Sequence, residues 1–112
     1  MPLDDLSDLP EEALLARYAT GDRMAARVLV MRLSPRLLSY VYRLLHDRAE
    51  AEDVVQEALL RLWRMAPDWR TGEARVTTWL YRVATNLVTD RQRARQRRRG
   101  TALEDAPEPA DT

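Results

Sequence analysis

The sequence of 112 residues contains no cysteine, so it can form neither a disulfide nor a thiolate metal site. It holds a single histidine, His46, which removes most of the remaining zinc chemistry. No nucleophile stands beside a histidine in the sequence, and no glycine-rich phosphate loop is present. We therefore expect a protein that is not an enzyme and that needs neither a metal nor a cofactor.

A long apolar run is also missing. The first residues, MPLDDLSDLPEE, lack the basic start and the apolar core of a secretion signal, and nothing later is long enough to span a membrane. The length suits one domain with a single hydrophobic core and is too short for two. We therefore expect a cytoplasmic, single-domain chain.

Lysine is absent, so all eighteen basic residues are arginine, and they balance eighteen acids. The balance is uneven along the chain. Residues 1–22 have six acids against Arg17, whereas residues 61–99 have eleven arginines against Asp68, Glu73 and Asp90. A basic block between acidic ends predicts a polyanionic partner for that block alone.

Five segments between residues 10 and 90 show helical periodicity, and none alternates as a strand would. Asp22 and Asp47 stand where they can cap the helices that follow them. Pro35 lacks a backbone donor, so a kink or a break is expected near Ser34. The pattern predicts an all-α fold, a compact bundle of four to five helices.

The last regular helix is expected to follow a loop at residues 66–75, APDWRTGEAR. Its apolar positions repeat without a miss from Val76 to Val88. Beyond Asp90 the segment RQRARQRRR has no apolar face, so it is helical only if a partner or its own weak propensity holds it. Residues 100–112 contain glycine, proline and acids, and we expect them to form a disordered acidic linker.

The segment AEDVVQEALLRLWRM, residues 51–65, has two stripes at helical spacing. One stripe is apolar and includes Val55, Leu59 and Leu62, which are expected to face the core. The opposite stripe is polar, and its partner cannot be read from spacing alone. Its members are Asp53, Gln56, Glu57, Arg61 and Arg64.

The last helix and its extension carry residue types that bind nucleic acid. Arginines at positions 82, 91, 93, 95 and 97–99 offer phosphate contacts. Tyr81 and Asn86, placed on one exposed face by the period, offer stacking and base hydrogen bonds, which suits partly single-stranded DNA. The alternative is a solvated face followed by a basic tail. Trp79 belongs to the apolar stripe, while Trp69, in the loop, either packs back on the bundle or awaits a ligand.

Two motifs in order resemble a known family. DRAEAEDVVQEALLRLWR followed by TTWLYRVATNLVTDRQRARQRR is similar to conserved region two of the bacterial sigma factors of the extracytoplasmic-function group. The resemblance runs from about Leu6 to Arg99. It implies a region two domain at residues 1–99, a linker at 100–112, and the absence of the region four domain, as in a truncated chain.

The resemblance implies a sigma-factor domain that docks on core RNA polymerase and recognises and helps melt the minus-ten promoter element. The polar stripe would bind the clamp helices of the largest polymerase subunit, with Leu60 as an apolar anchor among Asp53, Gln56, Glu57, Arg61 and Arg64. The loop and the last helix would bind the non-template strand and hold a flipped base. The expected DNA-binding residues are Trp69, Arg70, Arg75, Thr78, Trp79, Tyr81, Arg82, Thr85, Asn86, Arg91, Arg93 and Arg95.

The resemblance also implies an anti-sigma factor as a partner. Trp69 and Val76 stand where many relatives have phenylalanine, so base preference does not carry over. Two alternatives remain at this point. A sigma mimic that sequesters an anti-sigma factor would not need the basic face, and a general arginine-rich nucleic-acid module would not need the polar stripe.

Overall fold

The structure is a computed structural model that describes residues 6–105, with side chains described for residues 6–100. Its main elements, in chain order, are the helices Glu11–Ala19 (α2), Arg23–Leu45 (α3) and Arg48–Met65 (α4), the short 3-10 helix Ala66–Asp68 (η1), and the helix Val76–Asp105 (α5). No strand occurs within residues 6–105. The prediction of an all-α helical bundle is confirmed.

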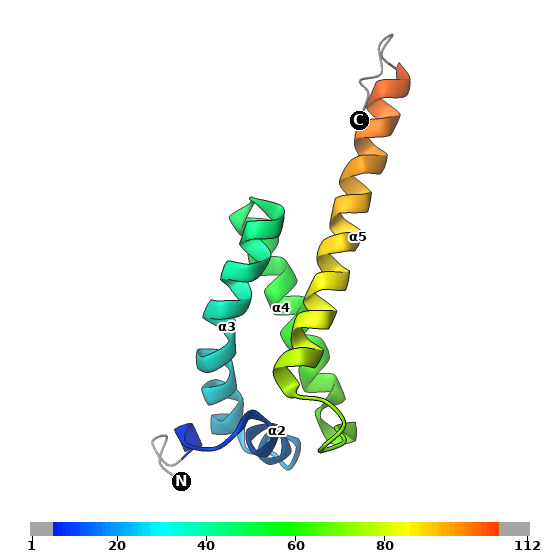
Figure 1. The fold of residues 1–112 in the computed structure, drawn as a ribbon. Coiled ribbons are helices and arrows are strands. Elements are labelled where there is room, and N and C mark those ends of the chain that lie inside the picture. Colours follow the sequence, from blue (N-terminus) through cyan, green and yellow to red (C-terminus); the bar gives the residue numbers. More distant parts are fainter. Residues whose placement is uncertain (1–5, 106–112) are drawn as a thin grey trace.

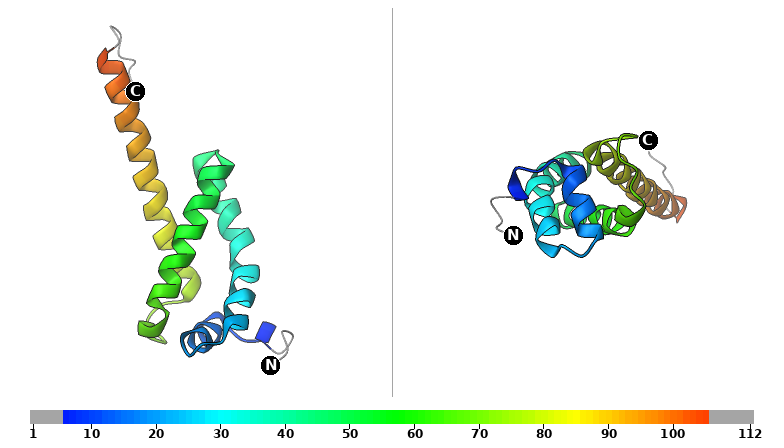
Figure 2. Two further views of the ribbon diagram at one scale, coloured as in Figure 1. Left: turned by 180° about the vertical axis from the view of Figure 1, so that it is seen from behind. Right: turned by 90° about the horizontal axis from the view of Figure 1, so that it is seen from below.

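The bundle is built on three long helices (Figure 1). α3 and α5 run in the same direction, and α4 runs antiparallel to both of them and packs against each. α2 lies across the end of the bundle where α3 begins, next to η1 (Figure 2). α5 continues well beyond the other helices, so the molecule has a packed end and a single-helix end.

The core is entirely apolar among the described residues, since no polar or charged side chain there is buried. Every helix contributes to it, as Leu15, Leu37, Leu62 and Leu80 illustrate. The apolar stripe predicted for residues 51–65 faces inward: Val54, Val55, Ala58, Leu59 and Leu62 are buried, and Trp63 is half-buried. Burial of this apolar surface is the main force that holds the helices together.

The predicted helix starts are confirmed by hydrogen bonds. The side chain of Asp22 accepts from the backbone N–H of Met24 at 3.0 Å and of Ala25 at 3.3 Å. The side chain of Asp47 accepts from the backbone N–H of Glu50 at 3.0 Å. Each aspartate therefore satisfies backbone donors that the first turn of a helix leaves free.

Helix α3 passes through Pro35 without a break, so the two segments predicted on either side of Ser34 form one helix. Leu33 and Leu37 flank the proline and are both buried. Their packing stabilises the helix on both sides of Pro35, which outweighs the loss of one backbone hydrogen bond. Tertiary packing therefore keeps α3 as one helix at the position where the proline alone favours an interruption.

Helix α5 is longer than its apolar pattern, because its buried residues end at Val88 and the helix ends at Asp105. The arginine-rich segment is therefore helical, and the predicted boundary between domain and linker at Arg99 falls inside α5. Residues 106–112 of the predicted linker lie outside the described part. None of the helices in residues 6–105 has the length and apolar character needed to cross a membrane.

Candidate functional site

The predicted polar stripe on α4 faces away from the core. Asp53, Gln56, Arg61 and Arg64 are exposed, and Glu57 is half-buried. The Arg61 guanidinium Nε donates to Oε2 of Glu57 at 3.1 Å, so two members of the stripe form an ion pair one turn apart. Leu60 lies among them and is 47% exposed. The stripe is thus one continuous outward face with both signs of charge and an apolar centre.

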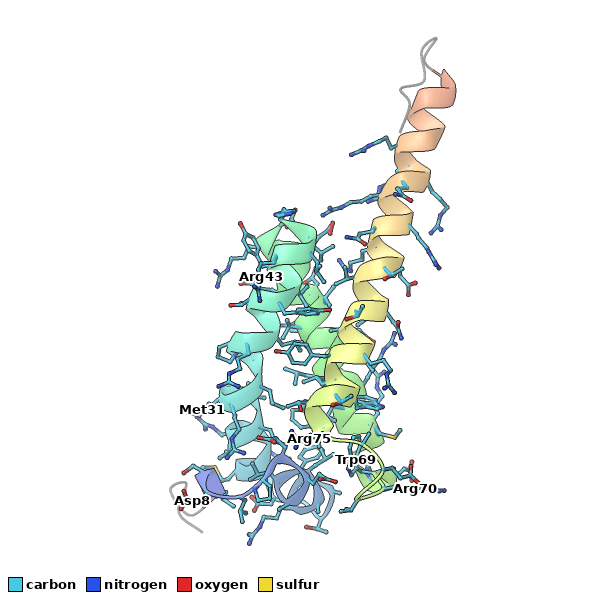
Figure 3. The ribbon with its side chains drawn as sticks, viewed as in Figure 1. Asp8, Met31, Arg43, Trp69, Arg70 and Arg75 are labelled. Atoms are coloured by element: carbon cyan, nitrogen blue, oxygen red, sulfur yellow. The ribbon has the colours of Figure 1, made fainter. Side chains whose placement is uncertain are left out.

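A small cavity of about 200 Å³, open to solvent on one side, lies between the loop that follows η1 and the helices α4 and α5. Trp69 packs back against the core, and its ring meets that of Trp79 edge to face, with 6.0 Å between the ring centroids. Arg70 extends away from the bundle at the same loop (Figure 3). The residues that line the cavity are Met65, Asp68, Trp69, Arg70, Glu73, Ala74 and Trp79. The prediction that Trp69 packs back on the bundle is confirmed, and its ring also lines the cavity.

A carboxylate of α2 holds this loop. Oε2 of Glu12 accepts from Nε1 of Trp69 at 3.4 Å and from the backbone N–H of Gly72 at 3.3 Å. Gly72 has a φ of 95°, a conformation that favours glycine and lets the chain turn beside the cavity. No sequence pattern indicated Glu12, because its partners lie about sixty positions away in the chain.

One face of α5 carries exposed polar residues next to the cavity. Arg75, Thr78, Arg82, Asn86 and Arg93 are all exposed. Their spacing of three, four and seven places them along one stripe of the helix. These predicted DNA-contact residues of the last helix therefore share one exposed stripe. Tyr81, Thr85, Arg91 and Arg95 do not belong to it.

Tyr81 and Thr85 lie on a different side of α5 from Asn86, which corrects the prediction that Tyr81 and Asn86 share an exposed face. The ring of Tyr81 packs on that of Tyr40 in α3, with centroids 5.0 Å apart. The hydroxyl groups of Tyr40 and Thr85 are hydrogen-bonded at 2.8 Å. The turn of the helix places Tyr81 toward α3, where it lines a second cavity of about 350 Å³ with Arg36.

Arg95 also differs from its expected place among free phosphate contacts. Its guanidinium donates to the backbone carbonyl of Leu45 at 3.3 Å and to the Glu50 carboxylate at 2.6 Å. The side-chain amide of Gln92 donates to the carbonyl of Leu44 at 3.3 Å. Both residues tie α5 to the turn between α3 and α4. Of its neighbours in the extension, Arg91 is half-buried and Arg93 is exposed.

A second residue that sequence reasoning missed is Arg32 of α3. Its guanidinium donates to the backbone carbonyls of Ser7 at 2.6 Å and Leu9 at 2.7 Å, and to the Glu11 carboxylate at 2.9 Å. It therefore fixes the segment before α2, and with it the position of α2 beside the loop. A single arginine in an amphipathic helix gives no signal of such distant partners.

Comparison with known proteins identifies the family. Residues 29–98, more than half of the chain, match the Sigma-70 region 2 family. The chain is 36% identical over 93 residues to the RNA polymerase sigma-H factor of Pseudomonas aeruginosa, covering 83% of this chain and 48% of that protein. It is 34% identical over 100 residues to the ECF RNA polymerase sigma-E factor of Escherichia coli K12, covering 89% and 51%. Similarity to the ECF RNA polymerase sigma factor SigG of Mycobacterium tuberculosis is 42% over 62 residues, covering 55% and 16%.

The chain thus spans about half the length of the first two of these relatives. The family match covers α4, the loop and most of α5, which are the elements that carry the outward faces described above. The resemblance read from the two motifs is confirmed, and the chain belongs to the Sigma-70 region 2 family.

Proposed function

We propose that this chain works as the region two domain of a sigma factor, which docks on core RNA polymerase and recognises and helps melt the minus-ten promoter element. The observation that carries the proposal is the family match at residues 29–98, which includes both the outward face of α4 and the loop with α5. The role is one of binding and positioning, without catalytic chemistry of its own, and belongs in the cytoplasm, where the polymerase works.

The polymerase surface is the outward face of α4, and its partner is the pair of clamp helices in the largest subunit. Leu60 supplies an exposed apolar centre, and the ion pair of Glu57 and Arg61 supplies charges at its edge. An apolar anchor surrounded by polar groups is the usual arrangement of an interface that gains most of its affinity from a few residues. The proposed contact residues are Asp53, Gln56, Glu57, Leu60, Arg61 and Arg64.

The DNA surface is the cavity at Trp69 with the exposed stripe of α5. A flipped base needs a shaped pocket and an aromatic surface, and the cavity of about 200 Å³ between Trp69 and Trp79 supports such a role. Arg75, Arg82 and Arg93 can neutralise phosphates next to it, and the Asn86 amide can bond a base edge. The ligand in this proposal is the non-template strand of the promoter.

An anti-sigma factor is the third proposed partner. The outward face of α4 is open in the described chain, so a protein that covers it would block docking on the polymerase. Co-purification with a neighbouring gene product tests this, followed by competition with isolated clamp helices. A bound partner that leaves clamp-helix binding unchanged would exclude occlusion as the mechanism.

The decisive experiment measures both surfaces on the same preparation. A pull-down with isolated clamp helices tests α4, and a titration with non-template promoter oligonucleotides, in the complex with core polymerase, tests the loop and α5. The proposal expects binding in both assays and a preference for promoter over scrambled strands. Clamp-helix binding without any promoter preference would contradict the proposal and favour a sigma mimic that sequesters an anti-sigma factor.

A further inference from the structure

The cavity at Trp69 depends on a residue that does not line it. Glu12 lies in the first turn of α2, at the N–H edge of the Trp69 indole, and does not line the cavity. A single oxygen of its carboxylate accepts two hydrogen bonds from the loop, one from the indole Nε1 of Trp69 and one from the backbone N–H of Gly72. The Trp69 indole forms part of the cavity wall, and Gly72 forms the turn beside the cavity.

The other polar contacts between residues 69 and 73 are local. Besides the Glu12 contacts, the loop has a backbone hydrogen bond from Trp69 to Ala66 at 3.2 Å, one from Glu73 to Arg70 at 3.5 Å, and an ion pair of Arg70 with Glu73 at 3.7 Å. The last two are long, and the Arg70 and Glu73 side chains are 79% and 68% exposed, so solvent screens their charges. Glu12 therefore supplies the hydrogen bonds that join the loop to α2, beside the packing of the Trp69 ring on the core and on Trp79.

We propose that Glu12 is a positioning residue that sets the shape of the cavity at Trp69 and so determines which base it accepts. The inference deepens the proposed function and rests on it. Without Glu12 the indole loses its hydrogen-bond partner and the Gly72 turn loses its anchor, so Trp69 can move relative to Trp79. A pocket that no longer holds one shape cannot discriminate between bases, although the arginines of α5 still bind the backbone.

The contacts that hold α2 in place also position Glu12. Its neighbour Glu11 pairs with Arg32, which also holds the carbonyls before α2. α2 is therefore tied to α3 on one side and to the loop on the other. Helix α2, which lies outside the matched residues 29–98, thereby contributes to recognition although Glu12 does not line the cavity.

The test compares three variants of the full chain in complex with core polymerase. Glu12→Ala removes the acceptor, Glu12→Gln keeps a neutral acceptor, and Asp8→Asn removes an equal charge from an exposed residue at the same end of the molecule. The readouts are the hydrogen exchange of the Gly72 amide and the ratio of affinities for promoter and scrambled non-template strands. Thermal melting shows whether each variant is folded.

We expect Glu12→Ala to speed Gly72 exchange and to lower the promoter preference, each by about three- to tenfold. Each range corresponds to one of the two lost hydrogen bonds, that of the Gly72 amide for exchange and that of the Trp69 indole for the preference. Glu12→Gln should keep most of the preference, and Asp8→Asn should behave as the unaltered chain. An unchanged preference in Glu12→Ala, unchanged Gly72 exchange, or an equal loss in Asp8→Asn would each overturn the inference. An unaltered chain with no promoter preference would instead overturn the proposed function, and the selectivity assigned to Glu12 with it.

Discussion

Glu12, Arg32 and Arg95 are polar residues whose side chains each join elements that are distant in the sequence. Each satisfies backbone groups at the end of an element: a glycine turn, the segment before α2, or the last carbonyl of α3. Backbone groups at such ends lack partners within their own element. These three residues therefore position the apolar helices more exactly than burial alone can.

Asn86 should carry sequence specificity, because its amide is exposed on α5 and can form two hydrogen bonds with a base edge. We expect Asn86→Ala to reduce the binding of the preferred single-stranded promoter sequence by about 1 to 3 kcal/mol, with much less effect on scrambled strands. Titration of non-template oligonucleotides at fixed salt measures this. Gln96→Ala, which removes an exposed amide further along α5, is the control. Equal losses on both strands would mean that Asn86 holds only the backbone.

Arg93 and Arg95 should differ although they are two positions apart. Arg93 is exposed, so Arg93→Ala should weaken binding to all DNA sequences and lower the salt slope by about one unit without affecting melting. Arg95 is paired with Glu50, so Arg95→Ala should lower the free energy of unfolding by about 1 kcal/mol. Salt titrations and thermal melting separate the two effects. A lowered salt slope in Arg95→Ala with unchanged melting would show that the pair opens to bind phosphate.

For the helices, the apolar period was enough to predict type and core face, and Asp22 and Asp47 were enough to predict the caps, because each of these depends on neighbours along the chain. The apolar period could not predict which residues of one helix contact the adjacent helix. Tyr81 and Asn86 both lie off the apolar stripe of α5, yet only the packing of α3 decides that Tyr81 meets Tyr40. The contacts of Glu12 were equally hidden, because no local pattern records a partner sixty residues away.

Substitutions on the outward face of α4 should affect docking on the polymerase without affecting stability. Gln56→Ala with Glu57→Ala should abolish most clamp-helix binding while changing the free energy of unfolding by less than about 0.5 kcal/mol, because both residues lie on the outward face. The measurements are a pull-down and thermal melting. The matched control is Glu52→Ala, which should still bind: Glu52 is an exposed residue of the same helix and forms an ion pair with Arg48. Loss of folding with normal binding per folded molecule would refute the docking role.

Helix α3 should gain stability from Pro35→Ala. Alanine restores the backbone N–H that can bond the carbonyl of Met31, and Pro35 is exposed, so no packing is lost. We expect the free energy of unfolding to rise by about 1 to 2 kcal/mol in chemical denaturation. Ser39→Ala, at an exposed position one turn later, controls for helix propensity alone. No gain would indicate that the carbonyl of Met31 stays turned away from the helix axis.

The molecule as a whole divides into a packed end and an extended end, and the charge divides in the same direction. The described chain extends 64 Å along its longest axis and 24 × 19 Å across it, chiefly because α5 continues past the bundle (Figure 1). The last buried residue of α5 within residues 6–100 is Val88, and Arg95, about two turns later, holds α5 to the turn between α3 and α4. The arginines that follow are exposed. The extended end therefore carries positive charge but has no hydrophobic core.

Amide protection along α5 should follow this division. We expect slow hydrogen exchange over residues 80–92 and much faster exchange over residues 96–100, because an isolated helix without packing is only marginally stable. Adding non-template DNA to the polymerase complex should slow exchange in the second segment, with residues 37–41 of buried α3 as the unchanged reference. Uniform protection along α5 in the free chain would show that the extension is stable on its own.

Because α5 is continuous, it sets the distance between its two ends. The helix joins the loop cavity to the arginine-rich end without a turn, and from Val76 to Arg99 it measures about 35 Å at the α-helical rise, close to the length of one turn of duplex DNA. In the proposed complex, the length of α5 thus sets the separation between a base at Trp69 and a phosphate near Arg99, once bound DNA stabilises the extension as a helix. One residue inserted after Asp90 would rotate every later side chain by about 100°, moving the extension out of phase with the strand while leaving the cavity intact.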